Sequence, residues 1–270
     1  MDSIFAALGI NFALLMGAII LLWGYACKIR DVSFIDAFWG FGMVIMAASS
    51  WVQMGMPGGR AALIIALVAA WGLRLALHLY TRWRANGADS RYTSILRSAM
   101  EKRGWNWPLA ALIMVFAMQA PLLFITCLPA QLGIMASADT GAIGGIAIIG
   151  ALAAIIGILF ESIGDAQLKT FKADPANAGK VMDTGLWRYT RHPNYFGDFL
   201  AWWGIWLIAA DAGFWVAAAS VAGPVFLSFT LMKWSGAPML ERGMKKRRPE
   251  YARYIERTSA FFPWPPNMRG

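Results

Sequence analysis

The sequence is poor in charged residues, histidine and cysteine. Only 14% of its 270 residues are Asp, Glu, Lys or Arg, whereas a soluble domain carries about a quarter. The two cysteines, Cys27 and Cys127, stand alone in separate apolar runs, so neither a disulfide framework nor a C-x-x-C motif is expected. The two histidines are not clustered either. The sequence therefore predicts no metal site and argues against a soluble globular protein.

Hydrophobic residues, in contrast, make up 59% of the chain. They form seven long apolar segments, each near the roughly 20 residues that span a bilayer: 5–27, 33–54, 61–81, 107–134, 141–163, 195–210 and 213–232. We therefore expect an all-α, polytopic membrane helical bundle of about seven transmembrane helices. The amino terminus has no basic stretch, so the first run is expected to be a span and not a signal peptide. No internal repeat or linker is visible, which favours a single domain over residues 1–270.

The net charge of +9 comes from basic residues that gather in a few segments. The segments 28–32, 82–106, 164–194 and 233–270 hold 22 of the 24 Lys and Arg residues. Membrane proteins collect Lys and Arg on their cytoplasmic side, so this bias predicts an external amino terminus and a cytoplasmic carboxyl terminus. It also explains the charge through membrane lipid, without a nucleic-acid partner.

Ionisable side chains inside apolar segments are costly in a bilayer and mark candidate functional positions. Six stand out: Arg74 and His78 in the third segment, Glu161 and Asp165 in the fifth, Asp36 in the second and Asp198 in the sixth. The first four form two pairs with i, i+4 spacing, which places each pair on one helix face. Their position next to the basic segments favours a shared cavity open to the cytosol. Mutual pairing within the bundle would explain each of them as well.

The stretch DTGLWRYTRHPNYFGDFLAWWGIW contains the change from a basic loop to an apolar helix. Pro193 suits a first helical position, because its missing N–H has no partner there. The backbone N–H groups of Asn194 and Tyr195, flanked by Arg188 and Arg191, would then form an anion site at a helix N-terminus. This pattern predicts a phosphate-bearing cofactor at the membrane surface. Binding of lipid headgroups by the same arginines is the alternative.

The carboxyl-terminal segment 233–270 is too polar to span a bilayer. Its basic residues alternate with aromatic ones, as in an interfacial helix that binds anionic lipid. The same composition suits a lid that closes the cofactor site, with arginines on phosphate groups and tyrosines packed on a ring. Charge alone leaves both interpretations open.

Several motifs recur in one known family. The block RHPNYFGD from Arg191 to Asp198 is preceded by GLW and followed by the polar tail, and the chain also contains SFIDAFWG, ADSRY and RTSAFFPWPP. Over nearly its whole length the sequence thereby resembles the steroid 5-alpha-reductase and sterol reductase superfamily, nearest to a bacterial branch of uncharacterised membrane proteins. The resemblance implies an integral protein of the bacterial inner (cytoplasmic) membrane that binds NADPH in its cytosolic half. It also implies reduction of a carbon–carbon double bond in a hydrophobic lipid or steroid-like substrate.

The resemblance further implies which residues contact NADPH. Trp187, Asn194, Tyr195 and Asp198 match nucleotide contacts, and Lys169 and Lys172 match residues that hold phosphates. Glu241 and Tyr251 match contacts made by the tail, although the spacing around Pro249 differs. With their basic neighbours, the expected cofactor-binding residues are Lys169, Lys172, Trp187, Arg188, Arg191, His192, Asn194, Tyr195, Asp198, Glu241, Arg247, Arg248 and Tyr251.

The chain departs from the family at the acid pair that grips a substrate carbonyl, a glutamate in the second span and a tyrosine in the third. The second span has Gln53 without an adjacent glutamate. The tyrosine position reads Leu79, and Tyr80 is turned from it by about 100° around a helix. The expected catalytic donors are therefore Tyr80, His78 and Asp36. They would polarise the carbonyl conjugated to the double bond while NADPH supplies hydride.

Two other functions share parts of this pattern. Isoprenylcysteine carboxyl methyltransferases have a similar RHPxY block and acidic tail but bind S-adenosylmethionine, which carries no phosphate. The five basic residues of 164–194 favour NADPH over that cofactor, although the charge bias of membrane proteins weakens the argument. A non-enzymatic lipid-binding or transport protein is the third candidate.

Overall fold

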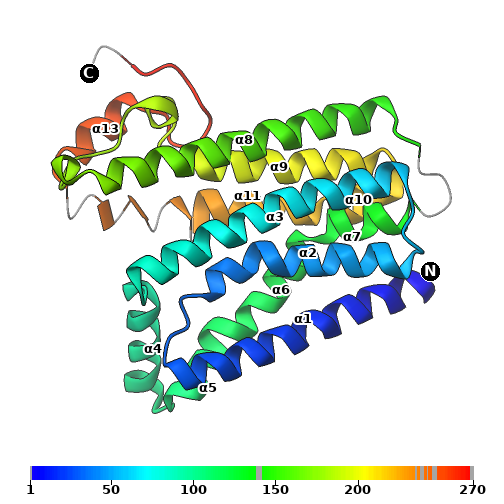
Figure 1. The fold of residues 1–270 in the computed structure, drawn as a ribbon, viewed down its shortest axis with the longest axis horizontal. Coiled ribbons are helices and arrows are strands. Elements are labelled where there is room, and N and C mark those ends of the chain that lie inside the picture. The colour runs from blue at the N-terminus through cyan, green and yellow to red at the C-terminus, as the bar shows by residue number, and fades with distance from the viewer. Residues whose placement is uncertain are drawn as a thin grey trace.

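The computed structural model describes residues 2–137, 142–234, 236–237, 240–241, 243–244 and 248–267. Every regular element in these ranges is helical, which confirms the all-α class. The helices that run along the bundle (Figure 1) are α1 (Asp2–Ile29), α2 (Ile35–Gln53), α3 (Gly59–Asn86), α5 (Trp107–Ala111) with the π-helix Leu112–Phe116, α6 (Ala117–Thr126), α7 (Leu128–Met135), α8 (Gly145–Ala173), α9 (Pro193–Ala210), α10 (Phe214–Ser220), and α11 (Ala222–Phe229) with the π-helix Thr230–Trp234. Shorter elements are α4 (Ser90–Arg103), two 3-10 turns (Pro175–Asn177 and Gly185–Arg188) and α13 (Tyr251–Arg257).

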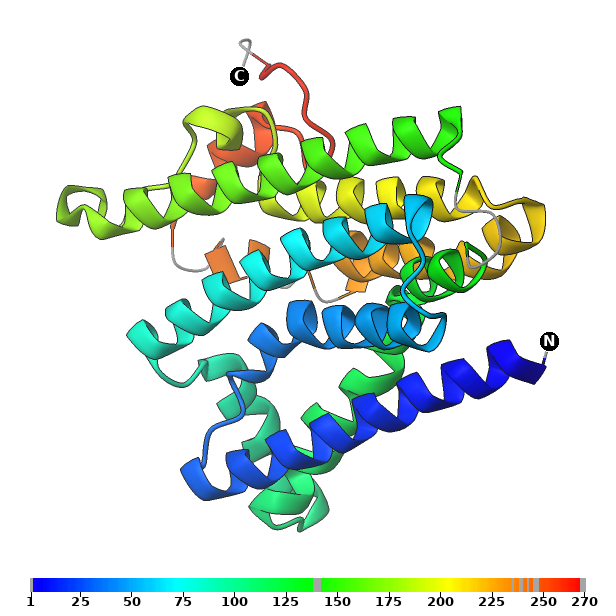
Figure 2. The same ribbon diagram turned by 45° about the vertical axis from the view of Figure 1, so that its right-hand side comes forward.

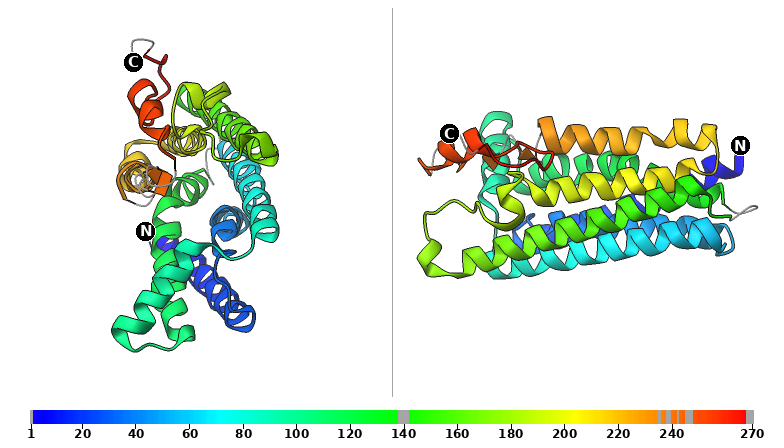
Figure 3. Two further views of the ribbon diagram at one scale, coloured as in Figure 1. Left: turned by 90° about the vertical axis from the view of Figure 1, so that its left-hand side faces the viewer. Right: turned by 90° about the horizontal axis from the view of Figure 1, so that it is seen from above.

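Six helical stretches in the described ranges are long and apolar enough to cross a membrane, which indicates an integral membrane protein. Helix α9 is not among them. It has 18 residues, and its first turns contain Asn194 and Asp198. It nevertheless lies along α8 in both views of Figure 3, and its chain direction is opposite. The expected count of about seven spans thus corresponds to six apolar ones and one shorter, more polar helix.

The two ends of the bundle differ in composition. The amino terminus, the α2–α3 turn and the α9–α10 turn lie at one end, which we call the N-terminal end (Figures 1 and 2). Helix α4, the α8–α9 connection and α13 lie at the opposite end, which we call the basic end. The basic segments 28–32, 82–106 and 164–194 all reach the basic end. This gathering on one side is what the charge bias predicts.

Residues 82–106 form more helix than the sequence suggested. Helix α3 continues through the arginines to Gly87, whose φ of 71° ends it. Asp89 then caps α4 by accepting a hydrogen bond from the backbone N–H of Arg91, and Gly104 ends α4 in the left-handed region. In Figure 1, α4 stands across the direction of the bundle helices at the basic end.

Helices α8 and α9 pack closely through glycines spaced seven residues apart. These are Gly150, Gly157 and Gly164 on α8, and Gly197 and Gly204 on α9. A Cβ on Gly157 would lie 2.5 Å from the carbonyl oxygen of Gly197, so only glycine allows this approach. At Gly145, the first residue of α8, a Cβ would have no atom within 4 Å.

Candidate functional site

An arginine and three carboxylates meet between α3, α8 and α9; we call them the carboxylate cluster (Arg74, Glu161, Asp165 and Asp198). Arg74 Nη1 donates to Asp165 Oδ2 at 2.7 Å, and Arg74 Nη2 forms an ion pair with Glu161. Trp71 Nε1 donates to the second oxygen of Glu161 at 3.0 Å. The pairing proposed from the two i, i+4 patterns is therefore observed. Glu161, only 3% exposed, is fully engaged by these two donors.

Among the described residues, Asp198 is the carboxyl group of the cluster without a hydrogen-bonding partner, and Arg74 Nε is likewise a buried donor without an acceptor. The Asp198 Oδ1 atom is buried and makes no hydrogen bond to any described residue. One turn further along α9, the fully buried Trp202 also has an indole N–H without an acceptor among the described residues. Buried polar atoms are nearly always hydrogen-bonded in folded proteins. Two unpaired atoms on neighbouring turns of one helix therefore mark this part of α9 as a candidate binding position.

His78 lies at the edge of the cluster on the side of the basic end. Its Nε2 is 3.7 Å from Asp165 Oδ2, and its side chain is 24% exposed. Tyr80, the other donor expected on α3, points elsewhere. It is 48% exposed and packs against the ring of Trp83 at 5.7 Å. The structure therefore brings His78 to the cluster and leaves Tyr80 outside it.

Asp36 forms a second polar group with residues that follow α3. The Tyr92 hydroxyl donates to Asp36 Oδ1 at 2.5 Å, and Arg91 Nη2 lies 3.3 Å from Asp36 Oδ2. Arg82 approaches the same oxygen at 3.9 Å. Burial and the adjacent Asp36 carboxylate raise the pKa of Tyr92 above its usual range. The phenol therefore stays protonated at neutral pH and can act as a hydrogen-bond donor.

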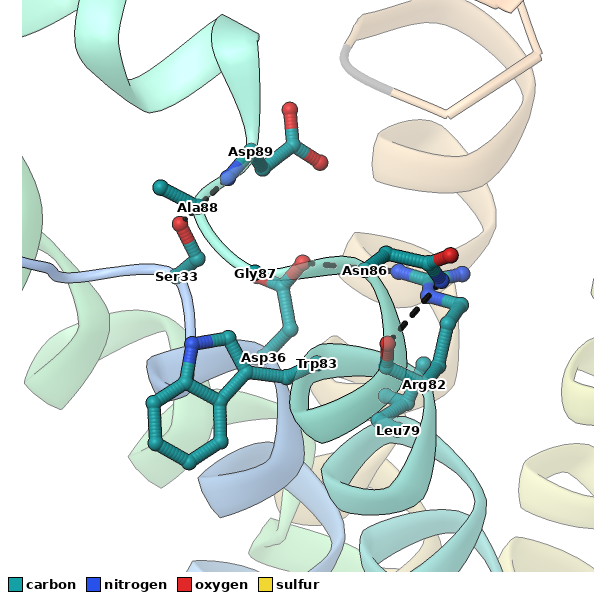
Figure 4. A pocket seen from close by; sticks show the side chains of 9 residues that line it. All are labelled: Ser33, Asp36, Leu79, Arg82, Trp83, Asn86, Gly87, Ala88 and Asp89. Carbon is teal, nitrogen blue, oxygen red and sulfur yellow. Dashed lines mark hydrogen bonds and ion pairs between the residues drawn. The ribbon is translucent and has the colours of Figure 1, made fainter.

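This Asp36–Tyr92 pair lies beside a cavity of about 130 Å³ at the basic end (Figure 4). The cavity is lined by Ser33, Asp36, Leu79, Arg82, Trp83, Asn86, Gly87, Ala88 and Asp89. Its wall is largely polar, and Figure 4 shows Asp36 and Arg82 directed toward each other across it. A space of this size holds several waters or one small functional group.

Tyr195 connects this cavity region with the carboxylate cluster. As expected, Pro193 begins α9, and the Tyr195 ring stacks on His192 with centroids 5.5 Å apart. The Tyr195 side chain lies within electrostatic range of Arg91, Arg82, Asp36 and Asp198. Members of both polar groups therefore lie near this one side chain of α9.

The tail is fastened to the start of α9 by three side chains, which we call the tail latch (Arg191, His192 and Glu241). Glu241 Oε1 accepts from Arg191 Nε at 2.8 Å and lies 3.0 Å from His192 Nε2. Burial alone would raise the pKa of Glu241, but the contacts with His192 and Arg191 outweigh it and lower the pKa to about 2. Glu241 is therefore ionised at neutral pH and holds both basic side chains.

Backbone groups add to the tail latch. Arg191 Nη1 also donates to the carbonyl oxygen of Thr258 at 2.7 Å. The Tyr254 hydroxyl donates to the carbonyl oxygen of Trp187 at 2.5 Å, and Trp187 Nε1 donates to the carbonyl oxygen of Gly164. Arg191 and Trp187, both expected as cofactor contacts, thus hold the tail and α8 against the α9 N-terminus.

The remaining expected cofactor residues lie around the basic end. Lys169, Lys172 and Arg188 are exposed, and Tyr251 is buried against Tyr254 with ring centroids 5.6 Å apart. Asn194 is half-buried, and its side-chain oxygen accepts from the Tyr195 backbone N–H at 3.1 Å. Arg248 is half-buried in the tail. Arg247 lies outside the described residues.

Sequence reasoning missed Tyr92 and Arg91 as site residues. The motif ADSRY was noted only as part of a resemblance, and nothing in it shows that its tyrosine reaches Asp36. The available signal was a polar, aromatic segment directly after a long membrane helix. Trp202 was missed because a tryptophan in an apolar helix normally packs in the core.

Comparison with known proteins places the chain in a family. No solved structure matches it. The "Uncharacterized protein C594.04c" of Schizosaccharomyces pombe is 22% identical over 287 aligned residues, which cover 94% of this chain and 78% of the yeast protein. A family model described as "Protein of unknown function (DUF1295)" matches residues 22–258, a range that contains the carboxylate cluster, the Asp36–Tyr92 pair and the tail latch. The chain therefore belongs to the DUF1295 family.

Proposed function

We propose that the chain is an NADPH-dependent membrane reductase. It would reduce a carbon–carbon double bond conjugated to a carbonyl in a hydrophobic lipid or steroid-like substrate, in line with the resemblance to the steroid 5-alpha-reductase and sterol reductase superfamily. The observation that carries the proposal is the Asp36–Tyr92 pair, a protonated phenol held 2.5 Å from the Asp36 carboxylate, which lines the cavity at the basic end. Such a donor stabilises the negative charge that develops on a carbonyl oxygen during reduction.

The side chains at the basic end fit the cofactor. NADPH, when bound, supplies the hydride, and its carboxamide offers both N–H donors and a carbonyl acceptor. The Asp198 Oδ1 atom, which has no hydrogen-bonding partner among the described residues, would accept from an N–H of such an amide and leave the second carboxyl oxygen for a proton. Lys169, Lys172 and Arg188 are exposed at the same end and carry the charge that phosphate groups require.

Each polar group then has a role in the reaction. Tyr92 would turn its single hydroxyl hydrogen from Asp36 to the substrate carbonyl, while Arg91 continues to pair with Asp36. The tail latch holds Glu241 against Arg191 and His192 at the start of α9, and exclusion of water there would strengthen the donor. We also propose that the basic end lies on the cytoplasmic side of a bacterial inner membrane, in accord with the charge bias.

The proposal is tested by ligand-induced thermal stabilisation of the purified protein in detergent. A ligand at a hundredfold excess over its Kd stabilises a protein by about 2.7 kcal/mol, so NADPH is expected to raise Tm. NADH is expected to raise Tm less if Lys169, Lys172 or Arg188 holds the extra phosphate. The variant Arg188→Gln should reduce the NADPH shift, whereas Lys180→Gln, at an exposed lysine of the same connection, serves as the matched control. The absence of any shift with NADPH would contradict the proposal.

One observation favours a second candidate, an S-adenosylmethionine-dependent methyltransferase of the isoprenylcysteine carboxyl methyltransferase type. Arg191 Nε and Nη1 are occupied by Glu241 and tail carbonyls, so these two donor atoms are not available for a phosphate. The negative carboxylate cluster would also suit a sulfonium cation. A Tm shift with S-adenosylmethionine and none with NADPH would decide for this alternative. A shift with neither would favour a lipid-binding or transport protein.

A further inference from the structure

The carboxylate cluster contains more acidic side chains than basic ones. Arg74 is its one guanidinium, and both Glu161 and Asp165 contact it. These two carboxylates are 3% and 7% exposed, so water does not compensate their charge. Asp198 is a third carboxyl group; the residue as a whole is half-buried, but its Oδ1 is buried, and Arg74 is already shared by the other two. The cluster therefore lacks one positive charge at the position of Asp198.

No cation in the described parts of the surrounding helices supplies that charge. The titratable groups within electrostatic range of Asp198 are Arg74 from α3, Glu161 and Asp165 from α8, and Tyr195 from α9 itself. His78 contacts Asp165, and Arg82 and Arg91 are engaged with Asp36 and Asp89. An unpaired carboxylate costs several kcal/mol in a low-dielectric interior. A neutral carboxylic acid at Asp198 removes this cost.

The hydrogen-bonding pattern around Asp198 agrees with a bound proton. Its buried Oδ1 has no donor among the described residues, although an ionised carboxylate normally collects two or more. Trp202, with 0% exposure, packs edge-on against Trp71 at 5.2 Å, and its own indole N–H is also left without an acceptor in the described ranges. This nearby donor on the same helix is therefore not used to stabilise a charge on Asp198.

A route for protons leads from the cluster toward the basic end. His78 is 24% exposed, and its Nε2 lies 3.7 Å from Asp165 Oδ2. Asp165 and Glu161 both touch Arg74, so the polar groups are continuous from His78 to the centre of the cluster. Imidazole exchanges protons with water near neutral pH, which suits it for the entrance of such a route.

From this arrangement we infer that Asp198 carries one exchangeable proton at neutral pH, loaded from the basic end through His78 and Asp165. The role of that proton in catalysis rests on the proposed function. Reduction of a double bond needs a hydride on one carbon and a proton on its neighbour. Asp198 gives its proton to the second carbon, and a proton entering at His78 restores it, so that one NADPH and one proton are consumed for each double bond.

Infrared difference spectroscopy of the purified protein tests the bound proton without substrate or cofactor. At neutral pH the wild type is expected to show the carbonyl stretch of one protonated carboxyl group, shifted in D₂O. Asp198→Asn should lose this band, whereas Glu101→Gln, which removes an exposed carboxylate on α4, should keep it. If Asp198→Asn does not fold, carbon-13 labelling of aspartate in the wild type should shift the band, and labelling of glutamate should not. A missing band, or one that follows glutamate, would overturn the inference.

The route is tested by the rate at which the same band responds to D₂O. His78→Asn is expected to slow exchange by about tenfold or more, since it removes one proton-transfer group and raises the barrier. An unchanged rate would overturn the route through His78. Neither result depends on NADPH oxidation, so failure of the proposed reductase activity would leave the proton on Asp198 as a separate finding.

Discussion

Two arginines lie within the bundle helices, a buried one (Arg60) at the N-terminal end and a half-buried one (Arg74) nearer the basic end, and their partners differ. At the N-terminal end, Arg60 donates to Asp211 Oδ2 at 3.0 Å and to Ser137 Oγ at 3.0 Å. The backbone N–H of Gly144 donates to the same carboxylate oxygen at 2.9 Å. Nearer the basic end, Arg74 is shared by Glu161 and Asp165, and Asp198 is left over.

This difference in charge balance distinguishes a structural ion pair at Arg60 from a candidate functional site at Arg74. Arg60 and Asp211 balance in charge and join the start of α3 to the α9–α10 turn, so this pair stabilises the fold and offers nothing to a ligand. It also explains the position of Arg60, one of the two arginines outside the basic segments of the sequence. The carboxylate cluster is unbalanced and incompletely hydrogen-bonded, as groups that bind or exchange something often are.

Breaking the balanced pair is expected to have the largest effect on stability. Arg60→Met leaves Asp211 as a buried charge without its cation, which should lower the free energy of unfolding by about 3–5 kcal/mol. Thermal unfolding in detergent measures the loss. The double variant Arg60→Met/Asp211→Leu removes both charges and should recover most of the stability. A single variant as stable as the wild type would show that the pair does not hold this end together.

At the basic end, the corresponding change should affect the reaction and not the fold. Tyr92→Phe removes the hydroxyl that contacts Asp36 and should reduce turnover about a hundredfold, the lower range for loss of a positioned acid. NADPH oxidation with a hydrophobic enone measures this effect, and Tm should change little. Tyr80→Phe is the matched control, because Tyr80 is exposed on the last turns of α3 and should retain activity. Loss of turnover in Tyr80→Phe alone would restore the assignment made from the sequence.

Helix α8 runs between the two ends, and its glycines also differ in their surroundings. Gly157 packs against α9, whereas Gly145 has open space beside it. Gly157→Ala places a methyl group against the backbone of α9 and should destabilise the protein by about 1–3 kcal/mol through overpacking. Gly145→Ala meets no atom within 4 Å and should leave stability unchanged or slightly raised. Chemical unfolding of the two variants side by side measures the difference. Equal effects would mean that α8 and α9 do not pack through the seven-residue glycine spacing.

The fold followed from the sequence because each span must bury a fixed length of apolar chain. The seven apolar runs correspond to the observed helical passes, and the start of α9 at Pro193 is confirmed. The ends of α3 and α8 extend further than expected, to Asn86 and Ala173. Hydropathy ends where charge begins, but a helix can continue beyond the apolar segment, with its Lys and Arg side chains in the polar region.

The site was only partly accessible from the sequence, for a physical reason. The i, i+4 pairs on α3 and α8 indicated correctly which faces carry charge, since that spacing is local. Asp36 and Tyr92 are 56 residues apart, and His192 and Glu241 are 49 apart. Their contacts depend on how whole helices and the tail pack, which no local pattern determines. That Asp198 lacks a basic partner of its own could be recognised only once the partners of Arg74 were known.

Mutation of the tail latch is expected to have the smallest effect of these changes. Its effect on tail opening should depend on pH within a defined range. A glutamate has an ordinary pKa of about 4.3, and that of Glu241 is lowered to about 2. Its ionised form therefore stabilises tail closure fully above pH about 4.3, and this stabilisation is lost as the pH falls toward about 2. Glu241→Gln exchanges charge-assisted hydrogen bonds for neutral ones and should favour tail opening by about 1 kcal/mol at neutral pH.

Hydrogen exchange of the tail residues 251–257, followed against pH, measures this opening. The wild type should lose protection across the window from about 4.3 to about 2, whereas Glu241→Gln should start from lower protection and lack that acid-dependent step. Glu250→Gln is the control, because Glu250 is exposed in the same tail and should keep the wild-type profile. If Glu241→Gln and the wild type lose protection together, closure depends on the backbone contacts of Arg191 and Tyr254 and not on the latch carboxylate. Closure would then be permanent, and the basic end would have to admit its ligand from another side.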